Sequence, residues 1–204
     1  MLNKDNYETP TTKSINYTNK LVKKQIVWWK TFFDVQAPYR WNLWQLKPGF
    51  TLDIGCGIGR NLINLQGKGI GIDHCLPSVQ VARKRGLSAF KPDDFQTSKF
   101  NTPQKFDSIL LAHVAEHMNQ NEVLELLKEY IHLLKPGGKL IIITPQEVGY
   151  RSDPTHVELM NFSKLRNITK QLGLKTFKEY SFPFPRFFGY LFIYNEFISV
   201  NYKL

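Results

Sequence analysis

The sequence predicts an α/β fold in which a doubly wound, mostly parallel sheet carries helices on both faces. Apolar, strand-like stretches alternate with helical stretches from Thr51 onward, a pattern typical of such sheets. The first strand, at about 50–54, runs directly into the glycine turn 55–59 (Gly-Cys-Gly-Ile-Gly), and the second, at about 69–73, ends on Asp73. The glycines let the backbone approach a ligand closely, and a terminal acid can accept hydrogen bonds from a ribose. Strand, glycine turn, helix, strand and acid at this spacing predict a nucleotide-binding site.

The other elements follow from hydrophobic periodicity. Val22, Ile26, Trp29 and Phe33 recur at helical spacing among lysines, so we expect an amphipathic helix from about residue 19. An aromatic-rich connection, 37–44, leads into the first strand. Beyond Asp73 the pattern predicts, in order, a helix at 77–85, a strand from 88, a strand at 106–112, a helix at about 121–134, a strand at 139–143, a helix at 163–171 and two strands in the tail 174–204. The segment Lys-Pro-Gly-Gly at 135–138 is expected to stop its helix, because proline cannot continue the hydrogen-bond ladder.

Length and composition indicate one ordered domain. The 204 residues, 42% of them hydrophobic, suit a single domain at 1–204, with 1–47 as an N-terminal helical cap and 48–204 as the ligand-binding core. No stretch approaches the ~18 apolar residues of a membrane span, and the first residues lack the apolar core of a signal peptide, so we expect no membrane association. The two cysteines, Cys56 and Cys75, suggest no disulfide framework, which favours a cytoplasmic setting.

The net charge of +10 lies in the two flanks of the chain. Residues 1–50 and 160–204 each carry an excess of +5, whereas 51–159 contain 12 basic and 12 acidic residues. A basic surface is either a merely solvated face or a surface that attracts an anion. The second reading predicts a carboxylate, a phosphate or RNA as the partner.

The glycine turn is similar to motif I of the class I S-adenosylmethionine (SAM)-dependent methyltransferases. It departs from the NAD spacing G-x-G-x-x-G, and the chain has no Walker-type Gly-Lys-Ser/Thr. The resemblance covers roughly residues 48–180, because 106–111 is similar to the motif IV strand and 134–140 to the Leu-Lys-Pro-Gly-Gly turn of this superfamily. It implies a Rossmann-like seven-stranded sheet whose last strand is antiparallel, with strands six and seven supplied by an aromatic hairpin in the tail.

The resemblance implies that SAM binds at the carboxyl ends of the first strands. Asp53 and the glycine turn would surround the methionine part, and Asp73 would hold the ribose diol. An acid after the third strand would meet the adenine amino group, and the sequence does not choose between Asp93 and Asp94. The expected cofactor-binding set is Asp53, Gly55, Cys56, Gly57, Gly59, Asp73, His74, Asp93, Asp94 and Ala112.

A second cluster of chemically active residues follows the strand 106–112. His113, Glu116 and His117 stand at i, i+3 and i+4, positions that share one face of a helix. His156 follows the strand 139–143, and both segments leave the carboxyl edge of the sheet, where ligands bind. The set His113, Glu116, His117 and His156 therefore predicts a metal site, and its imidazoles suit Fe, Mn, Zn, Ni or Co better than Mg.

This cluster resembles the Glu-x-x-Glu-His of the small-RNA 3′-terminal 2′-O-methyltransferases and of the ubiquinone-type O-methyltransferases. Glu116 and His117 match the last two positions, and His156 the later histidine of the RNA enzymes. His113 replaces the first glutamate, which favours a transition metal over Mg. His-x-x-Glu-His also matches an inverted zinc-protease motif, which the surrounding methyltransferase pattern excludes. Two alternatives stay open: metal-free catalysis by His113, His117 or His156, with His113 or His156 as general base, and a purely structural role.

Aromatic and basic residues near both ends predict the acceptor pocket. Arg40 and Arg186 each stand between rings, with Tyr39 beside Arg40, and Arg151 follows the fifth strand; these four are candidate contacts to a carboxylate or phosphate. We expect O-methylation of a small anionic metabolite, because no RNA-binding module is recognisable. The alternatives are an RNA 2′-O-methyltransferase acting at an RNA end, for which aromatic and basic residues offer stacking and phosphate contacts, a metal-independent methyltransferase of small molecules, and a non-catalytic SAM-binding protein. The chain is expected to be a monomer or homodimer.

Overall fold

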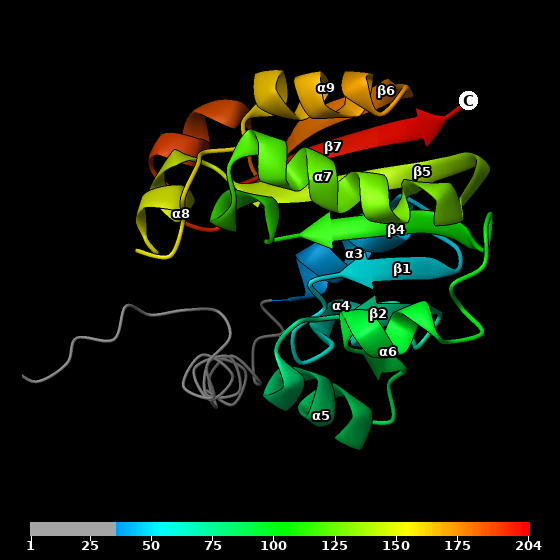
Figure 1. Cartoon of the computed structure of the whole chain (residues 1–204). Coiled ribbons are helices and arrows are strands. Elements are labelled where there is room, and N and C mark those ends of the chain that lie inside the picture. The colour runs from blue at the N-terminus through cyan, green and yellow to red at the C-terminus, as the bar shows by residue number, and fades with distance from the viewer. Residues whose placement is uncertain (1–35) are drawn as a thin grey trace, which may run out of the picture.

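A computed structural model describes residues 36–204, whose seven strands form one sheet (Figure 1). The strand order is β3-β2-β1-β4-β5-β7-β6, and β7 alone runs antiparallel to its neighbours. The strands are β1 (Thr51–Ile54), β2 (Gly69–Ile72), β3 (Ala89–Phe90), β4 (Phe106–Ala112), β5 (Leu134–Pro145), β6 (Leu174–Phe182) and β7 (Glu196–Lys203). The predicted seven-stranded, mostly parallel sheet with an antiparallel last strand is confirmed.

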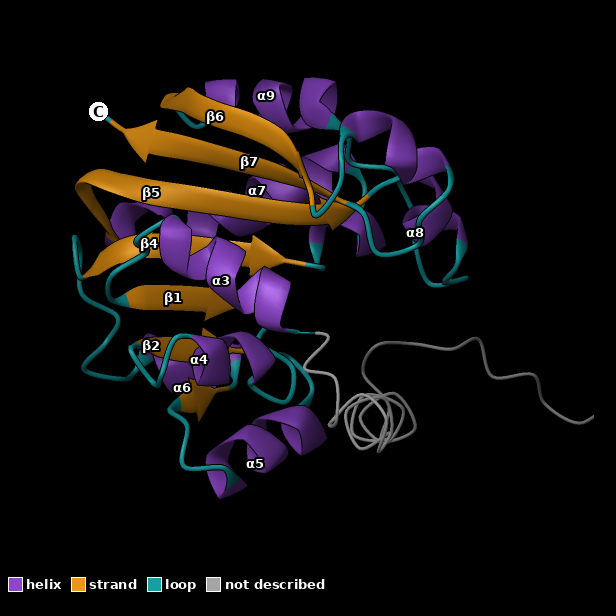
Figure 2. Cartoon of the chain, turned by 180° about the vertical axis from the view of Figure 1, so that it is seen from behind, coloured by secondary structure: helices purple, strands orange, loops and turns teal. Residues whose placement is uncertain are grey.

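Helices cover both faces of this sheet, as predicted. Figure 1 shows α6 (Pro92–Gln96), α7 (Gln120–Tyr130) and α9 (Phe162–Gln171) in front of the sheet. Figure 2, the view from behind, shows α3 (Ala37–Gln45) and α4 (Arg60–Asn64) on the opposite face. Two further helices are α5 (Leu76–Lys84), near β3, and α8 (Glu147–Arg151), at the carboxyl edge of the sheet beyond β5.

Each face of the sheet has its own apolar core. Leu127 of α7 and Leu165 of α9 pack with Leu111 and Ile142 in the larger core. On the other face, Leu43 of α3 joins a smaller core. Its members from the central and antiparallel strands are Leu110, Ala112, Ile141, Ile143, Ile198 and Val200. Because β4 is covered on both faces, its sequence is almost continuously apolar. This burial fixes the central strands, and the residues that follow them are held at the carboxyl edge.

Several element boundaries differ from the sequence-based expectation. The helix expected at 121–134 ends at Tyr130, and a short 3-10 turn, Ile131–Leu133, follows it. The Lys-Pro-Gly-Gly segment lies within β5, where Gly137 has a left-handed φ of 70° and bends the extended chain. Residues 37–44, expected as a connection, are helical, and the short helices α6 and α8 were not predicted. They have only five residues each, too few for a hydrophobic period to be read.

The helix expected near residue 19, in the N-terminal cap, lies outside the described residues. Among residues 36–204, no helix combines the length and the apolar character that crossing a membrane requires.

Candidate functional site

The glycine turn after β1 adopts a backbone that its glycines make possible. Gly55, Gly57 and Gly59 have φ values of 73°, 53° and 82°, in the left-handed region that side chains disfavour. A Cβ on Gly55 would also overlap the side chain of Val114, which follows β4. The turn therefore presses directly against the segment that begins the second cluster, and a larger residue at Gly55 would force the two apart.

Asp73 closes this turn from the end of β2. Its Oδ2 accepts a hydrogen bond from Gly57 N at 2.7 Å, and its Oδ1 accepts one from Cys75 N at 2.8 Å. A carboxylate can accept about four hydrogen bonds, so two acceptor positions remain. The expected role of Asp73 toward a ribose diol needs two of them.

Asp53 is a fully buried acid with an unpartnered oxygen. Its Oδ1 receives only a long contact from Asn61 Nδ2, at 3.4 Å, and its Oδ2 is buried without a hydrogen-bond partner. Burial raises the pKa of this carboxyl to about 7. An unsatisfied carboxylate beside a glycine turn fits a ligand with a positive charge. SAM, with an ammonium and a sulfonium group, is such a ligand, so the residues present fit the expected cofactor.

The other expected cofactor contacts lie around the same strand ends. Cys56 lies buried in the turn, Ala112 is buried at the end of β4, and His74 is exposed directly after Asp73. Both acids lie in the first turn of α6. Asp94 forms an exposed ion pair with Arg83 at 3.4 Å, and the negative charge of Asp93 contributes to raising the pKa of Tyr130. The choice between the two acids for adenine stays a prediction.

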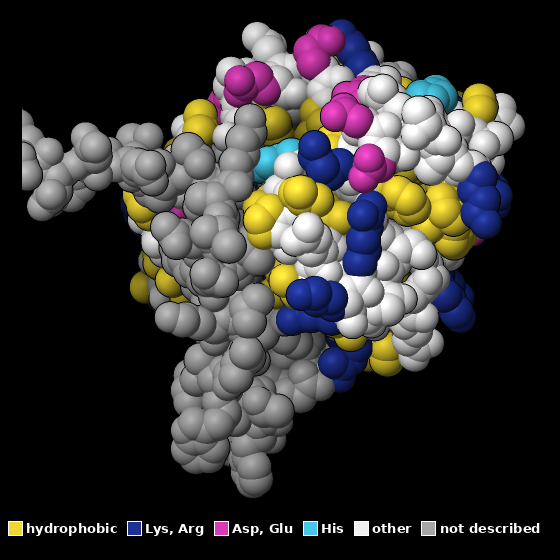
Figure 3. Space-filling model, turned by 60° about the horizontal axis from the view of Figure 1, so that its bottom comes forward, with side chains coloured by type: hydrophobic (Ala, Val, Ile, Leu, Met, Phe, Trp, Pro, Cys, Tyr) yellow, Lys and Arg dark blue, Asp and Glu magenta, His cyan; other side chains and the backbone are white. Residues whose placement is uncertain are grey.

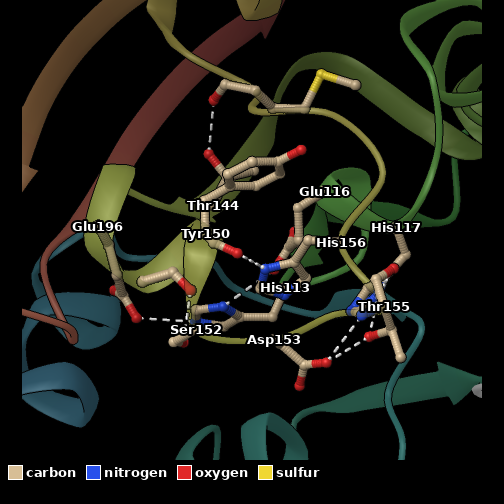
Figure 4. Close-up of polar contacts among 12 residues, drawn as sticks. His113, Glu116, His117, Thr144, Tyr150, Ser152, Asp153, Thr155, His156 and Glu196 are labelled. Carbon is tan, nitrogen blue, oxygen red and sulfur yellow. Dashed lines mark hydrogen bonds and ion pairs between the residues drawn. The ribbon is translucent and has the colours of Figure 1, made fainter. Parts of the chain in front are cut away.

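Glu116, His117 and His156 converge at the carboxyl edge. One possible ligand atom from each lies within 4.8 Å of the others, and Figure 4 shows the three side chains grouped together. The backbone brings them there, because Val157 N donates to Glu116 O at 2.7 Å and so ties the loop after α8 to the segment after β4. A metal bonded at about 2.1 Å would set tetrahedral ligands about 3.4 Å apart. The separation in the structure exceeds this by little more than 1 Å.

The contacts of the two histidine rings determine which nitrogen is available to a ligand. His156 Nδ1 lies 2.6 Å from Tyr150 O, and His117 Nδ1 lies 3.1 Å from Thr155 O. A carbonyl oxygen can only accept, so each Nδ1 carries the proton and each Nε2 keeps its lone pair. Backbone carbonyls behind metal-binding histidines commonly play this role. Both rings are thus prepared to bind an electrophile through Nε2.

Glu116 supplies a buried carboxylate to this group. It is 1% exposed, and neither of its oxygens has a hydrogen-bond partner. Its nearest charge is His113, whose Nδ1 lies 3.4 Å from Oε1. A buried carboxylate without hydrogen bonds is costly, and the ion pair with His113 offsets part of that cost. Beside two imidazole nitrogens, the carboxylate could also serve as a ligand to a cation.

His113, the fourth residue of the predicted set, lies between two carboxylates. Its Nε2 forms a hydrogen bond of 2.8 Å with Oε1 of Glu196, the first residue of β7. Its Nδ1 faces Glu116 (Figure 4). Desolvation lowers the pKa of this ring, but the two carboxylates outweigh that effect and raise it to about 10. With both carboxylates free of other ligands, His113 is therefore held as an imidazolium between Glu116 and Glu196.

The local backbone explains why the helical-face argument does not describe this segment. His113 has a left-handed φ of 58°, and only a 3-10 turn, Ala115–His117, follows it. His113 and His117 consequently do not share a helix face. Glu196 was missed by the sequence reading. The signal for it was an acid within the largely apolar stretch 187–200, where a charged residue requires a partner.

The four candidate acceptor contacts differ in their surroundings. Tyr39 donates to Tyr194 O at 2.9 Å, and burial raises the pKa of its phenol. Arg40 lies over the Trp44 ring at 5.7 Å, and Arg151 is exposed at the end of α8. Arg186 forms an ion pair with Glu147, which satisfies much of its charge within the protein.

Known proteins resemble this chain at two levels. Residues 39–179 match the family model described as a methyltransferase domain. The probable tRNA methyltransferase 9B of Homo sapiens and that of Bos taurus are each 37% identical over 121 residues, which cover 54% of this chain and 26% of those proteins. The chain thus spans about a quarter of the length of these curated relatives.

Solved structures share the fold. A SAM-dependent methyltransferase from Archaeoglobus fulgidus superposes with a TM-score of 0.62 at 19% identity, over 86% of this chain and 98% of that one. A Haloferax volcanii complex between the Trm112 methyltransferase activator and the putative methyltransferase matches with a TM-score of 0.58 at 20% identity, over 76% of this chain and 82% of that one. At these identities the likeness concerns the fold alone.

Proposed function

The chain belongs to the methyltransferase domain family, and from this premise we propose that it transfers the methyl group of SAM to an oxygen of an RNA of the tRNA class. SAM-dependent methyl transfer follows from the family itself. The RNA substrate is supported by the relatives, which are named as probable tRNA methyltransferases. They favour the RNA alternative over the small anionic metabolite that we expected from the sequence. An RNA substrate and the buried free thiols Cys56 and Cys75 fit a reducing, cytoplasmic setting.

The surface around the site supports an anionic polymer. On the face shown in Figure 3, Lys and Arg side chains lie between hydrophobic side chains, and histidine, Asp and Glu side chains lie in the upper part of the view. Arg60 follows the glycine turn and Arg151 ends α8, and both are exposed. Exposed cations around a site attract phosphates over several ångströms and are suited to a nucleic acid backbone.

The group Glu116, His117 and His156 carries the chemical part of the proposal. We assign to these three residues a divalent transition metal, with open coordination positions for the acceptor, since three protein ligands are typical of catalytic sites. When bound there, such an ion would lower the pKa of a coordinated hydroxyl and orient it. A vicinal diol, such as the terminal ribose of an RNA, offers the two oxygens that chelation requires.

The protein's own groups have distinct tasks in this scheme. Asp53 and the glycine turn would hold the methionine part of SAM, and Asp73 its ribose. Thr155 and Tyr150 fix the two histidine rings through their carbonyls. His113, held as an imidazolium, balances the charge of Glu116 and Glu196 and so keeps two acids at one edge of the sheet.

Transfer of radiolabel from SAM tests the substrate. The full chain is incubated with [methyl-³H]SAM and bulk tRNA, and label is counted in acid-precipitable RNA. We expect incorporation that Asp73→Ala abolishes through loss of SAM binding and His117→Ala abolishes with SAM binding retained. RNA treated with periodate, which destroys the terminal diol, should accept no label. Label in treated RNA would refute the terminal ribose, and label only in added carboxylates would refute the RNA substrate.

Metal content tests the three-residue site. Protein purified without a His-tag or chelators is analysed by inductively coupled plasma mass spectrometry, before and after loading with Zn²⁺ or Mn²⁺. We expect near-stoichiometric metal, lost in Glu116→Gln and in His117→Ala. His132→Ala is the matched control, since His132 is exposed in the 3-10 turn after α7. Wild-type protein that binds no metal after loading would contradict the assignment.

A further inference from the structure

We propose that the connection between β6 and β7 is a stacking platform for unpaired RNA bases next to the methylated nucleotide. This inference rests on the proposed RNA substrate and adds the surface that would hold it. We call the surface the aromatic lip; it comprises Phe184, Phe187, Phe188, Tyr190, Phe192 and Tyr194. Four observations carry the proposal: exposure of the rings, their rigid support, their position and their charge.

The aromatic lip exposes rings that a monomeric protein would normally bury. Phe187 and Tyr190 are 59% and 58% exposed, and Phe184 and Tyr194 are also exposed. Their rings contact one another in series. The ring centroids of Phe187 and Phe188 are 4.3 Å apart, and those of Phe184 and Phe188 are 5.1 Å apart. A continuous exposed patch of this kind marks a binding surface.

A buried polar network holds the backbone of the lip in place. Asn195, which is fully buried, accepts from Phe184 N at 3.0 Å and donates to Gln146 Oε1 at 2.9 Å. Arg186 pairs with Glu147, and its guanidinium lies 5.1 Å from the centre of the Tyr190 ring. The rings are thus presented from a supported turn, which reduces the entropy lost when a flat ligand stacks on them.

The lip adjoins the candidate active site. A Cβ on Gly149 of α8 would overlap the Ile193 carbonyl, so the lip packs against α8. The next residue, Tyr150, stacks its ring on His156 at 5.6 Å with an interplanar angle of 18°. On the other side, Tyr194 accepts a hydrogen bond from Tyr39. A nucleotide placed at Glu116, His117 and His156 would therefore have its neighbours within reach of the lip.

The segment 183–194 carries no negative charge that would repel a nucleic acid. The segment 183–194 contains Arg186 and no acid, and the nearby Glu147 is paired with that arginine. Arg151, the last residue of α8, is also exposed. Aromatic rings among cations accept any base by stacking while the cations contact phosphates. Leu191 and Ile193 are exposed aliphatic residues of the same segment, and the exposed aromatic rings outnumber them.

Binding of single-stranded RNA to ring-removal variants tests this surface. The probe is a fluorescein-labelled, unstructured RNA of about 10 nucleotides, measured by anisotropy with the full chain in the presence of S-adenosylhomocysteine. Phe187→Ala should weaken binding by about fivefold or more, and Phe187→Trp should restore it. The matched control is Phe177→Ala on the edge strand β6, an equally exposed ring that contacts Tyr202. The control should bind RNA like the wild type, and all variants should keep wild-type SAM affinity.

Two outcomes would overturn the inference. The first is an RNA affinity of Phe187→Ala equal to that of Phe177→Ala while the wild type still methylates RNA. The second is a wild-type dimer, seen by light scattering, that Phe187→Ala converts to a monomer, which would make the lip an interface between copies. Absence of any RNA methylation by the wild type would instead refute the proposed function, so the two failures are distinguishable.

Discussion

Replacing Asp53 with asparagine should stabilise the ligand-free protein at pH 8 and abolish its binding of SAM. The folded-state pKa of about 7 lies above the ordinary value of 3.8, because the carboxyl is buried. The folded protein therefore retains a proton that the unfolded chain releases, and the free energy of unfolding falls as the pH rises from about 4 to about 7. The shift of about three units corresponds to about 4 kcal/mol. In Asp53→Asn the buried amide still has an unpaired polar group, which costs about 1–3 kcal/mol. The net gain in the free energy of unfolding at pH 8 should therefore be about 1–3 kcal/mol.

Urea unfolding at pH 5 and pH 8 measures this effect. The gain of Asp53→Asn over the wild type should be clear at pH 8 and small at pH 5. Asp107→Asn is a control of opposite sign, because hydrogen bonds from Lys135 and from Phe50 N lower the pKa of Asp107. That substitution should destabilise the protein at pH 8. An Asp53→Asn protein that is less stable than the wild type at pH 8, or whose effect is independent of pH, would refute the reasoning.

The wild type offers a second test of the same carboxyl. If the ionised form of Asp53 faces the cationic part of SAM, protonation must compete with binding. With a pKa of about 7, calorimetry should find SAM affinity roughly tenfold weaker at pH 6 than at pH 8. An affinity that is constant over this range would show that the charge of Asp53 does not contribute.

Three further substitutions probe the turn, the histidine support and the lip. Gly55→Ala should destabilise the fold by about 2–4 kcal/mol and prevent SAM binding, since it adds a clash with Val114 to a left-handed φ. The control is Gly67→Ala, which has a similar φ but open space around the added methyl group, and it should lower the free energy of unfolding by about 1 kcal/mol. Thr155→Val keeps the carbonyl but removes a hydroxyl that lies 3.2 Å from His117 Nδ1 and donates to Asp153 Oδ1, so it should weaken metal binding by up to about tenfold in a chelator competition. Arg186→Met leaves Glu147 unpaired and should lower stability by about 1–2 kcal/mol in urea unfolding, and equal stability would show that this pair is replaceable.

The sheet was predictable because its strands are buried on both faces. Residues 106–112 are apolar except for Asp107 and Ser108, and the structure gives β4 these same bounds. The glycine turn was predictable because alternating glycines after a strand serve few other purposes. The short helices α6 and α8 were not, because a five-residue helix is stabilised by its tertiary surroundings rather than by a periodic face.

The second cluster was predicted from spacing, but its geometry has another cause. Glu116, His117 and His156 meet because a loop is bonded to a 3-10 turn through Val157 N, which no periodicity encodes. The role of His113 depends on Glu196, a partner 83 residues away in the chain that only the antiparallel β7 brings close. Pairings over such separations depend on strand order, so the charge state of His113 could not be read from its neighbours in sequence.

Identification of the methylated product tests the central claim most directly. Bulk tRNA is incubated with the protein and SAM carrying a trideuterated methyl group, then digested to nucleosides and analysed by mass spectrometry. The account predicts a trideuteromethyl group on a ribose oxygen, absent with His117→Ala and present with His132→Ala. A label found only on a base nitrogen, or no label in RNA while a small carboxylate accepts it, would contradict the account.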